Sequence, residues 1–334
     1  MATTSPLEKV PFELLLLIVE NLSQSALNNF ALTNRNFHAK LNPLLYKRAV
    51  QDEGHEEKQS ALDWALSHRS EPTLDLLLES GLDIEAPIIG QSWIAKRWYI
   101  WSLDPPTPLL AAAAQGTEWA VRILIAKGAN VNATKEAGET PLHAAARWGF
   151  ESLIRPLVEA GANLEAPTES YGWRPLWVAA HCPTWNNGRR KTDTIGAIRE
   201  LVALGADIEG RDLINGLSPL DEAVESGYVR AVKVLLELGA DVSAAGKDNI
   251  QAIHRAAYGG HLPIVQMLVN HGADLKAKVF DGQTPLSIYR RTFGTYPSLD
   301  QAVNADSQFS RLAFHEIVQL LKPPGSEEED SWGS

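Results

Sequence analysis

The side chains that could carry out covalent chemistry meet in one dipeptide, His181-Cys182. A cysteine becomes a catalytic nucleophile when a neighbouring base removes its proton. Adjacent residues on a helix point about 100° apart, so His181 is poorly placed to act as that base. Both residues fall at the end of an expected helix, which explains them without catalysis. We therefore expect that the chain is not an enzyme.

The other histidines and carboxylates form neither a catalytic nor a metal-binding pattern. The histidine and cysteine residues lack the ligand spacing of a zinc site, and the glycines mark expected helix ends and turns rather than a phosphate-binding loop. His143 and His254 occupy the same position in two copies of a repeat, so we expect each to hydrogen-bond a neighbouring turn. Asp221 and Glu222 are interpreted as solvated repeat positions. The sequence thus predicts no cofactor and no metal.

Composition restricts the partners and the compartment. The chain has 334 residues and a net charge of −11, which disfavours attraction to nucleic acid or to an anionic membrane surface. One cysteine excludes an intramolecular disulfide and fits a reducing compartment. The most apolar run, near the N-terminus, is far shorter than the ~20 residues that span a bilayer. We expect an intracellular protein of the cytoplasm, the nucleus or both.

A repeat with a period of 33 residues fills most of the chain. TPLLAAAAQG begins at Thr107 and TPLHAAARWG begins 33 residues later at Thr140. Related segments begin further along at Arg174, Ser218, Gln251 and Thr284. A second motif closes each unit and recurs as GANV, GANL, GADI, GADV and GADL, beginning at Gly128, Gly161, Gly205, Gly239 and Gly272. A divergent first copy begins at Ser60.

Each motif position has a structural reason. Thr140 can cap a helix whose first turn accepts Pro141, because the missing N–H of proline would have no partner there. Gly149 can end that helix in a left-handed conformation. A second helix then follows, with Leu153, Ile154, Leu157 and Val158 at helical spacing. Since a unit of this size cannot bury its apolar face alone, neighbouring units must stack into a solenoid.

These motifs resemble the ankyrin repeat. The resemblance covers residues 60–322 and implies an all-α solenoid of about seven copies. Departures from the period predict insertions near residues 88–106, 181–192 and 295–314. Residues 323–334 end in an acidic run and are predicted to be a disordered tail.

The N-terminal residues do not repeat with the rest and are predicted to form three short helices. The first, VPFELLLLIVENL over residues 10–22, is apolar on every side, which is typical of a buried helix. The two following helices can cover only part of it. Burying three such side chains against a partner would contribute about 5–9 kcal/mol, at about 1.5–3 kcal/mol each.

This N-terminal pattern, together with Leu27, Leu32 and Asn34-Arg35-x-Phe37, resembles an F-box. The resemblance implies a three-helix domain over residues 1–50, joined by a linker at 51–59 to the solenoid. It also implies docking on a Skp-type adaptor and its cullin complex in an SCF (Skp, cullin, F-box) ubiquitin ligase. The adaptor-binding residues carried over from the family are Val10, Pro11, Leu14, Leu15, Ile18 and Leu22.

The alternative is that residues 1–48 only cap the open end of the solenoid. In that case the chain is an ankyrin scaffold for protein interaction without a role in ubiquitination. In the first interpretation the chain is a substrate receptor, in which the F-box holds the ligase and the repeats hold the target protein.

The ankyrin resemblance also implies where a protein partner binds. The positions around the mid-repeat glycine and in the finger-like turns line the concave face of such solenoids, and aromatic residues and arginine most often dominate interface energy. An aromatic insertion adds a second cluster, which could instead pack a seam between repeats. Trp177 is expected in the core. The predicted partner-binding residues are Trp98, Tyr99, Trp101, Arg147, Trp148, Tyr171, Trp173, Tyr258 and Phe280.

Overall fold

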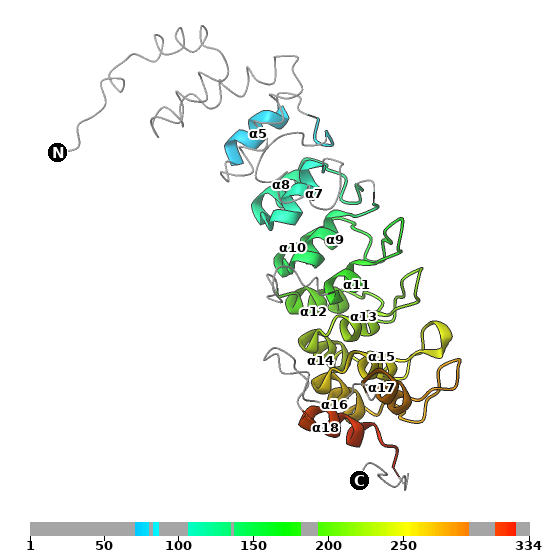
Figure 1. The fold of residues 1–334 in the computed structure, drawn as a ribbon. Coiled ribbons are helices and arrows are strands. Elements are labelled where there is room, and N and C mark those ends of the chain that lie inside the picture. The colour runs from blue at the N-terminus through cyan, green and yellow to red at the C-terminus, as the bar shows by residue number, and fades with distance from the viewer. Residues whose placement is uncertain are drawn as a thin grey trace, which may run out of the picture. The chain divides into compact units, whose positions relative to one another are not determined.

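A computed structural model describes residues 71–79, 83–86, 106–134, 137–181, 193–293 and 311–324, shown in Figure 1. The predicted F-box over 1–50, with all six adaptor-binding residues, and the linker 51–59 lie outside the described residues. So do Trp98, Tyr99 and Trp101 of the first insertion. Within the described ranges, no helix has the length and apolar character needed to cross a membrane.

The chain divides into two compact units, residues 1–136 and 137–334. In the first unit the structure describes helices α5 (Glu71–Glu79), α7 (Pro108–Gln115) and α8 (Glu118–Ala126). Helices α7 and α8 pack against each other, and α5 buries Leu74 and Leu77. Glu85 links two turns of this unit, because its Oε1 accepts a hydrogen bond from the backbone N–H of Asn130 at 2.7 Å.

In the second unit, pairs of helices follow one another along the chain (Figure 1). The first helices of the pairs contact each other in sequence order, and so do the second helices. The pairs are α9 (Pro141–Trp148) with α10 (Glu151–Glu159), α11 (Pro175–Ala180) with α12 (Ile195–Ala203), α13 (Pro219–Glu225) with α14 (Val229–Glu237), α15 (Ala252–Gly259) with α16 (Leu262–Asn270), and α17 (Pro285–Phe293) with α18 (Arg311–Leu321).

The second and third predicted insertions fall inside such pairs. Residues 181–194 separate α11 from α12, and residues 294–310 separate α17 from α18. Helix α18 begins at Arg311, within the range 295–314 that was predicted for the third insertion. The remaining connections, from the second helix of one pair to the first helix of the next, form turns that project on one side of the helices in Figure 1.

The ends of the helices confirm the roles predicted for the motif residues. Thr140 Oγ1 accepts a hydrogen bond from the backbone N–H of His143, and Pro141 occupies the first helical position. Gly149 ends α9 with φ 70° and ψ 26°, in the left-handed region that glycine adopts without steric cost. On α10, Leu153, Ile154 and Leu157 are fully buried. The repeat motif is therefore a set of helix boundaries around a continuous apolar core.

The two repeat histidines fasten neighbouring repeats together, as predicted. The His143 Nε2–H donates to the carbonyl oxygen of Trp173 in the next turn at 2.9 Å, while Nδ1 accepts from the N–H of Thr140 at 3.2 Å. His254 makes the equivalent bond from Nε2 to the carbonyl of Ala277 at 3.1 Å. Burial lowers the pKa of His143 to about 4, so its imidazole is neutral at pH 7.

Two glutamates in the turns add a second set of links between repeats. Glu165 Oε1 accepts from the backbone N–H of Asp207 at 2.8 Å, and Glu209 Oε1 accepts from that of Asp241 at 2.8 Å. Each glutamate follows the Gly-Ala-Asn-Leu or Gly-Ala-Asp-Ile motif of its repeat. The spacing of the turns is thus fixed by side chains that reach from one repeat to the backbone of the next.

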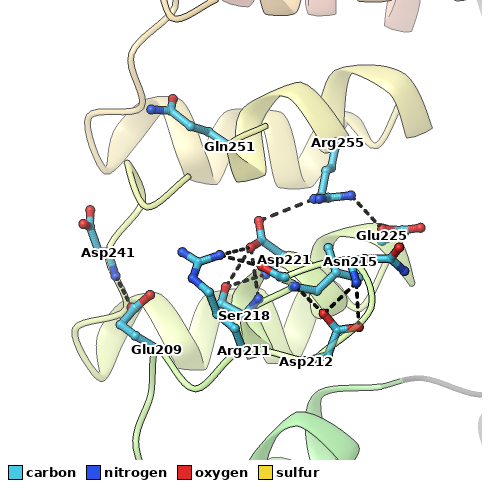
Figure 2. A network of polar contacts seen from close by, with 12 residues as sticks. Glu209, Arg211, Asp212, Asn215, Ser218, Asp221, Glu225, Asp241, Gln251 and Arg255 are labelled. Atoms are coloured by element: carbon cyan, nitrogen blue, oxygen red, sulfur yellow. Dashed lines mark hydrogen bonds and ion pairs between the residues drawn. The ribbon is translucent and has the colours of Figure 1, made fainter. Parts of the chain in front are cut away.

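The prediction that Asp221 and Glu222 are solvated is wrong, because they are only 1% and 7% exposed. Asp221 stands where two other copies have His143 and His254, and it caps its own helix by accepting from the N–H of Ser218 at 3.1 Å. Arg211 and, from the next repeat, Arg255 each approach its carboxylate at 3.6 Å (Figure 2). Desolvation raises the pKa of Asp221 despite these arginines. An ionic link thus replaces the histidine link in this repeat.

Candidate protein-binding surface

Four rings form a continuous stack on the second unit. Tyr171 and Trp173 lie in the turn before α11, Trp177 lies in α11, and His181 follows the end of that helix. Neighbouring ring centroids are 4.4, 4.7 and 5.7 Å apart, and the interplanar angles are 13°, 7° and 10°. Such close, parallel rings hold one another in place.

The turn that carries the stack is fixed by its backbone. Thr168 Oγ1 accepts from the N–H of Trp173 at 3.0 Å, and the N–H of Thr168 donates to the carbonyl of Trp173 at 3.0 Å. Gly172 has φ 69°, and an added Cβ would overlap the side chain of Leu213 in the next turn. The N–H of Leu213 donates to the carbonyl of Tyr171 at 2.9 Å. The stack is therefore held by two adjacent turns.

A groove of about 500 Å³ runs beside the stack. We call it the tryptophan groove. Glu222 Oε1 lies within hydrogen-bonding distance of two of its neighbours, His181 Nδ1 at 2.6 Å and Ser226 Oγ at 2.8 Å. The groove is lined by the four stacked rings together with Asp212, Ile214, Asn215, Leu217, Glu222, Glu225 and Ser226.

A second groove of about 690 Å³, here the tyrosine groove, lies between α15, α17 and the turns beside them. Tyr258 is 65% exposed and Phe280 is 89% exposed at this groove. The turn that carries Phe280 is tied to the preceding turn, because the N–H of Phe280 donates to the carbonyl of Asp248 at 2.9 Å. Asp248 itself has φ 57°, so this turn is held in a left-handed conformation.

The structure thus brings four of the predicted partner-binding residues to grooves. Tyr171 and Trp173 line the tryptophan groove, and Tyr258 and Phe280 line the tyrosine groove. Arg147 and Trp148 lie instead at the C-terminal end of α9, where Arg147 forms an ion pair with Glu139. Neither of these two residues lines either groove.

Sequence reasoning missed several residues of the tryptophan groove. Trp177 is 4% exposed and belongs to the core as predicted, yet it also forms part of the groove wall. Ile214, which lines the groove, and the adjacent Leu213, which does not, are 44% and 69% exposed in the turn RDLINGL. Two adjacent apolar residues in a polar turn were the available signal, since an apolar residue at the tip of a turn has no core to enter.

Among the described residues, no group of three or more histidine, cysteine, aspartate or glutamate side chains could hold a metal ion. The two grooves offer aromatic surface, carboxylates and backbone turns held by hydrogen bonds. These are the features of a surface that binds another molecule.

Comparison with known proteins agrees with this architecture. Residues 95–168 match the family described as "Ankyrin repeats (3 copies)", and residues 220–269 match "Ankyrin repeats (many copies)". The B-cell lymphoma 3 protein homolog of Mus musculus is 40% identical over 94 residues, which are 28% of this chain and 21% of that protein. Ankyrin repeat and SOCS box protein 6 of Homo sapiens is 41% identical over 91 residues, 25% of this chain and 22% of that protein. The chain thus spans about a fifth of the length of these relatives.

Solved structures show the same fold over most of the chain. The ankyrin repeat domain of Bcl-3 superposes with a TM-score of 0.56 at 26% identity, covering 78% of this chain and 97% of that one. The human ASB11 ankyrin repeat domain has the same TM-score at 22% identity, covering 79% and 98%. Residues 95–168 and 220–269 therefore match ankyrin-repeat families, and the paired helices have the fold of solved ankyrin repeat domains.

Proposed function

We propose that the chain is the substrate-recognition subunit of an SCF-type ubiquitin ligase. In this proposal residues 1–50 form an F-box that docks on a Skp-type adaptor, and the repeats hold the target protein. The chain itself is not an enzyme. It raises the effective concentration of the target's lysines near the conjugating machinery, and it works in the cytoplasm, the nucleus or both.

The observation that carries the binding half of the proposal is the exposure of aromatic side chains beside the two grooves. Phe280, in a turn, and Tyr258, on α15, are mostly exposed, and Tyr171 is 46% exposed at the end of its stack. Side chains as exposed as those of Phe280 and Tyr258 contribute little to the core of their own repeat. They are, however, the residue types that most often anchor an interface.

The ligase half depends on the sequence of residues 10–22. That helix is expected to be apolar all round, and the F-box resemblance supplies the partner that would cover it. A relative named for ankyrin repeats together with a SOCS box supports the general arrangement, in which repeats share one chain with a separate box. The competing function is an ankyrin scaffold whose N-terminal helices only cap the solenoid.

Substituting Pro11, Leu14 and Ile18 together by polar residues distinguishes the two functions. The receptor proposal expects that the adaptor no longer co-purifies with the chain, while the thermal melting of the repeats is unchanged. The control replaces three polar positions of the same segment by serine, Asn21, Gln24 and Asn28, and should retain the adaptor. A wild-type chain that binds no adaptor, but melts at a much lower temperature after the triple substitution, would establish the cap instead.

Phe280→Ala is expected to separate binding from folding. Because Phe280 is 89% exposed, its removal should change the free energy of unfolding by no more than about 0.5 kcal/mol. Affinity for a protein bound at the tyrosine groove should fall about tenfold or more, which corresponds to at least about 1.4 kcal/mol. Urea unfolding and titration with the bound protein measure the two effects. The matched control is Val229→Ala, an exposed apolar residue on α14 that lines neither groove.

A further inference from the structure

We propose that the tryptophan groove binds an arginine side chain of the target protein. This inference rests on the proposed function, since it assigns a chemical class to the protein that the repeats hold. It starts from the two most buried carboxylates of the groove, Asp212 and Glu222, which are 6% and 7% exposed.

Neither carboxylate has an arginine or lysine partner among the described residues. Asp212 accepts from the backbone N–H groups of Leu217 at 2.6 Å and of Asn215 at 3.2 Å. Glu222 is held by Ser226 Oγ at 2.8 Å and by His181 Nδ1 at 2.6 Å. Burying a carboxylate without a strong cation is costly, so a cation entering the groove would gain from both groups.

Two neighbouring carboxylates, Asp221 and Glu225, differ from this pair because arginines of the chain itself lie beside them. Asp221 faces Arg211 and Arg255, and Glu225 forms an ion pair with Arg255 at 3.0 Å. Figure 2 shows both arginines directed at Asp221, while Asp212 is directed at Asn215. Within the described part of the chain, no lysine or arginine lines the tryptophan groove. Among the described residues nothing supplies a cation to Asp212 and Glu222, so we assign that cation to the bound partner.

The aromatic wall selects arginine over lysine. A guanidinium ion is planar, weakly hydrated and able to donate two parallel hydrogen bonds to a carboxylate, and it packs well against aromatic rings. A lysine ammonium is compact and more strongly hydrated, so it loses more on entering a groove walled by Tyr171, Trp173 and Trp177. The volume of about 500 Å³ accommodates an arginine side chain together with flanking backbone.

The test is a titration of the full-length chain with the blocked peptide Gly-Ser-Arg-Ser-Gly, up to about 10 mM peptide. Calorimetry and tryptophan fluorescence measure the binding. Two further peptides replace the arginine by citrulline, which has the same shape without the charge, or by lysine. We expect saturable binding of the arginine peptide. The association constant should be at least tenfold lower for citrulline and severalfold lower for lysine.

Glu222→Gln supplies the protein side of the test, because glutamine keeps an acceptor for Ser226 and removes the charge. The substitution should lower the association constant of the arginine peptide at least tenfold and leave that of the citrulline peptide unchanged. Glu237→Gln is the matched control, since it removes one carboxylate from the exposed face of α14, where Glu237 pairs with Arg199 at 2.7 Å. This control should bind the arginine peptide like the wild type.

Three results of the titrations would overturn the inference, and a fourth would come from a variant of the insertion. The three are the absence of saturable binding, equal affinity for arginine and citrulline, or indifference to Glu222→Gln. Binding that occurs only after Arg189, Arg190 and Lys191 are replaced by alanine would assign the groove to the chain's own insertion and overturn it as well. The peptide titration does not involve the adaptor. If the peptide does not bind but the adaptor still co-purifies with the chain, the arginine site is refuted and the proposed receptor function is not.

Discussion

Lowering the pH from 6.5 to 4 is expected to remove about 3 kcal/mol of folding free energy through His143 alone. Burial lowers the folded-state pKa of this imidazole from 6.5 to about 4. Between these two values the unfolded chain binds a proton that the folded chain does not. The contribution of His143 is therefore fully present above pH 6.5 and is lost as the pH falls toward 4.

The measurement is urea unfolding of the wild type and of His143→Gln at pH 7 and at pH 4. The loss of stability between the two pH values should be about 3 kcal/mol smaller in the variant, because glutamine does not titrate. His254→Gln should change the pH dependence in the same direction, since burial also lowers the pKa of His254. A His143 ring that titrates near pH 6.5 by NMR in the folded chain would contradict this account of the link between repeats.

Gly149→Ala is expected to destabilise the second unit by about 3 kcal/mol or more. Gly149 ends α9 at φ 70°, and a Cβ at this position would overlap the backbone carbonyl of Asp193. A left-handed conformation costs a non-glycine residue about 1–2 kcal/mol, and overpacking adds about 1–3 kcal/mol. Because the overlapping atom belongs to the backbone, the clash cannot be relieved by turning a side chain.

Gly161→Ala is the matched control for the clash. Gly161 has φ 95°, but a Cβ there would meet nothing within 4 Å. The free energy of unfolding of this variant should fall only by the cost of the left-handed conformation, about 1–2 kcal/mol. Urea unfolding of both variants measures the difference. Equal destabilisation would show that α9 and the segment at Asp193 are not packed as closely as the structure places them.

The fold was predictable because residues in each repeat mark where its helices begin and end. Thr140, Pro141 and Gly149 mark one helix by cap, first turn and left-handed end, and the same marks return at the next copies. The link made by His143 also followed from its recurrence at His254. Helix caps and links between repeats recur along the chain, so the residue types that they require recur in the sequence at the same spacing.

Features that belong to one repeat were not predictable in this way. Asp221 and Glu222 resemble a solvated pair, yet one caps a helix between two arginines and the other forms part of a groove. Their burial depends on Arg255 from the next repeat and on His181 from the previous one. A side chain's environment that is assembled from three repeats leaves no local periodic signal.

The same reasoning explains why the binding surface was predicted only in part. Aromatic residues in the turns marked Tyr171, Trp173 and Phe280 as candidates, because such residues have little reason to be exposed otherwise. The stack that joins Trp173 to Trp177 and His181 required the turn and the helix to meet in space. The groove carboxylates became visible only when their distances to arginines were known.

The central claim is that one chain holds a target on its repeats and a ligase adaptor on its N-terminal segment. Proximity labelling in cells, with and without a proteasome inhibitor, tests this most directly when three chains are compared. These are the wild type, the chain with Pro11, Leu14 and Ile18 made polar, and the double variant Tyr171→Ala and Phe280→Ala.

The account predicts that the wild type labels the adaptor, the cullin and a set of proteins that accumulate when the proteasome is inhibited. The first variant should lose the adaptor and keep those proteins without the inhibitor, and the second should keep the adaptor and lose them. A wild-type chain that labels neither adaptor nor cullin, with partners unaffected by the inhibitor, would contradict it.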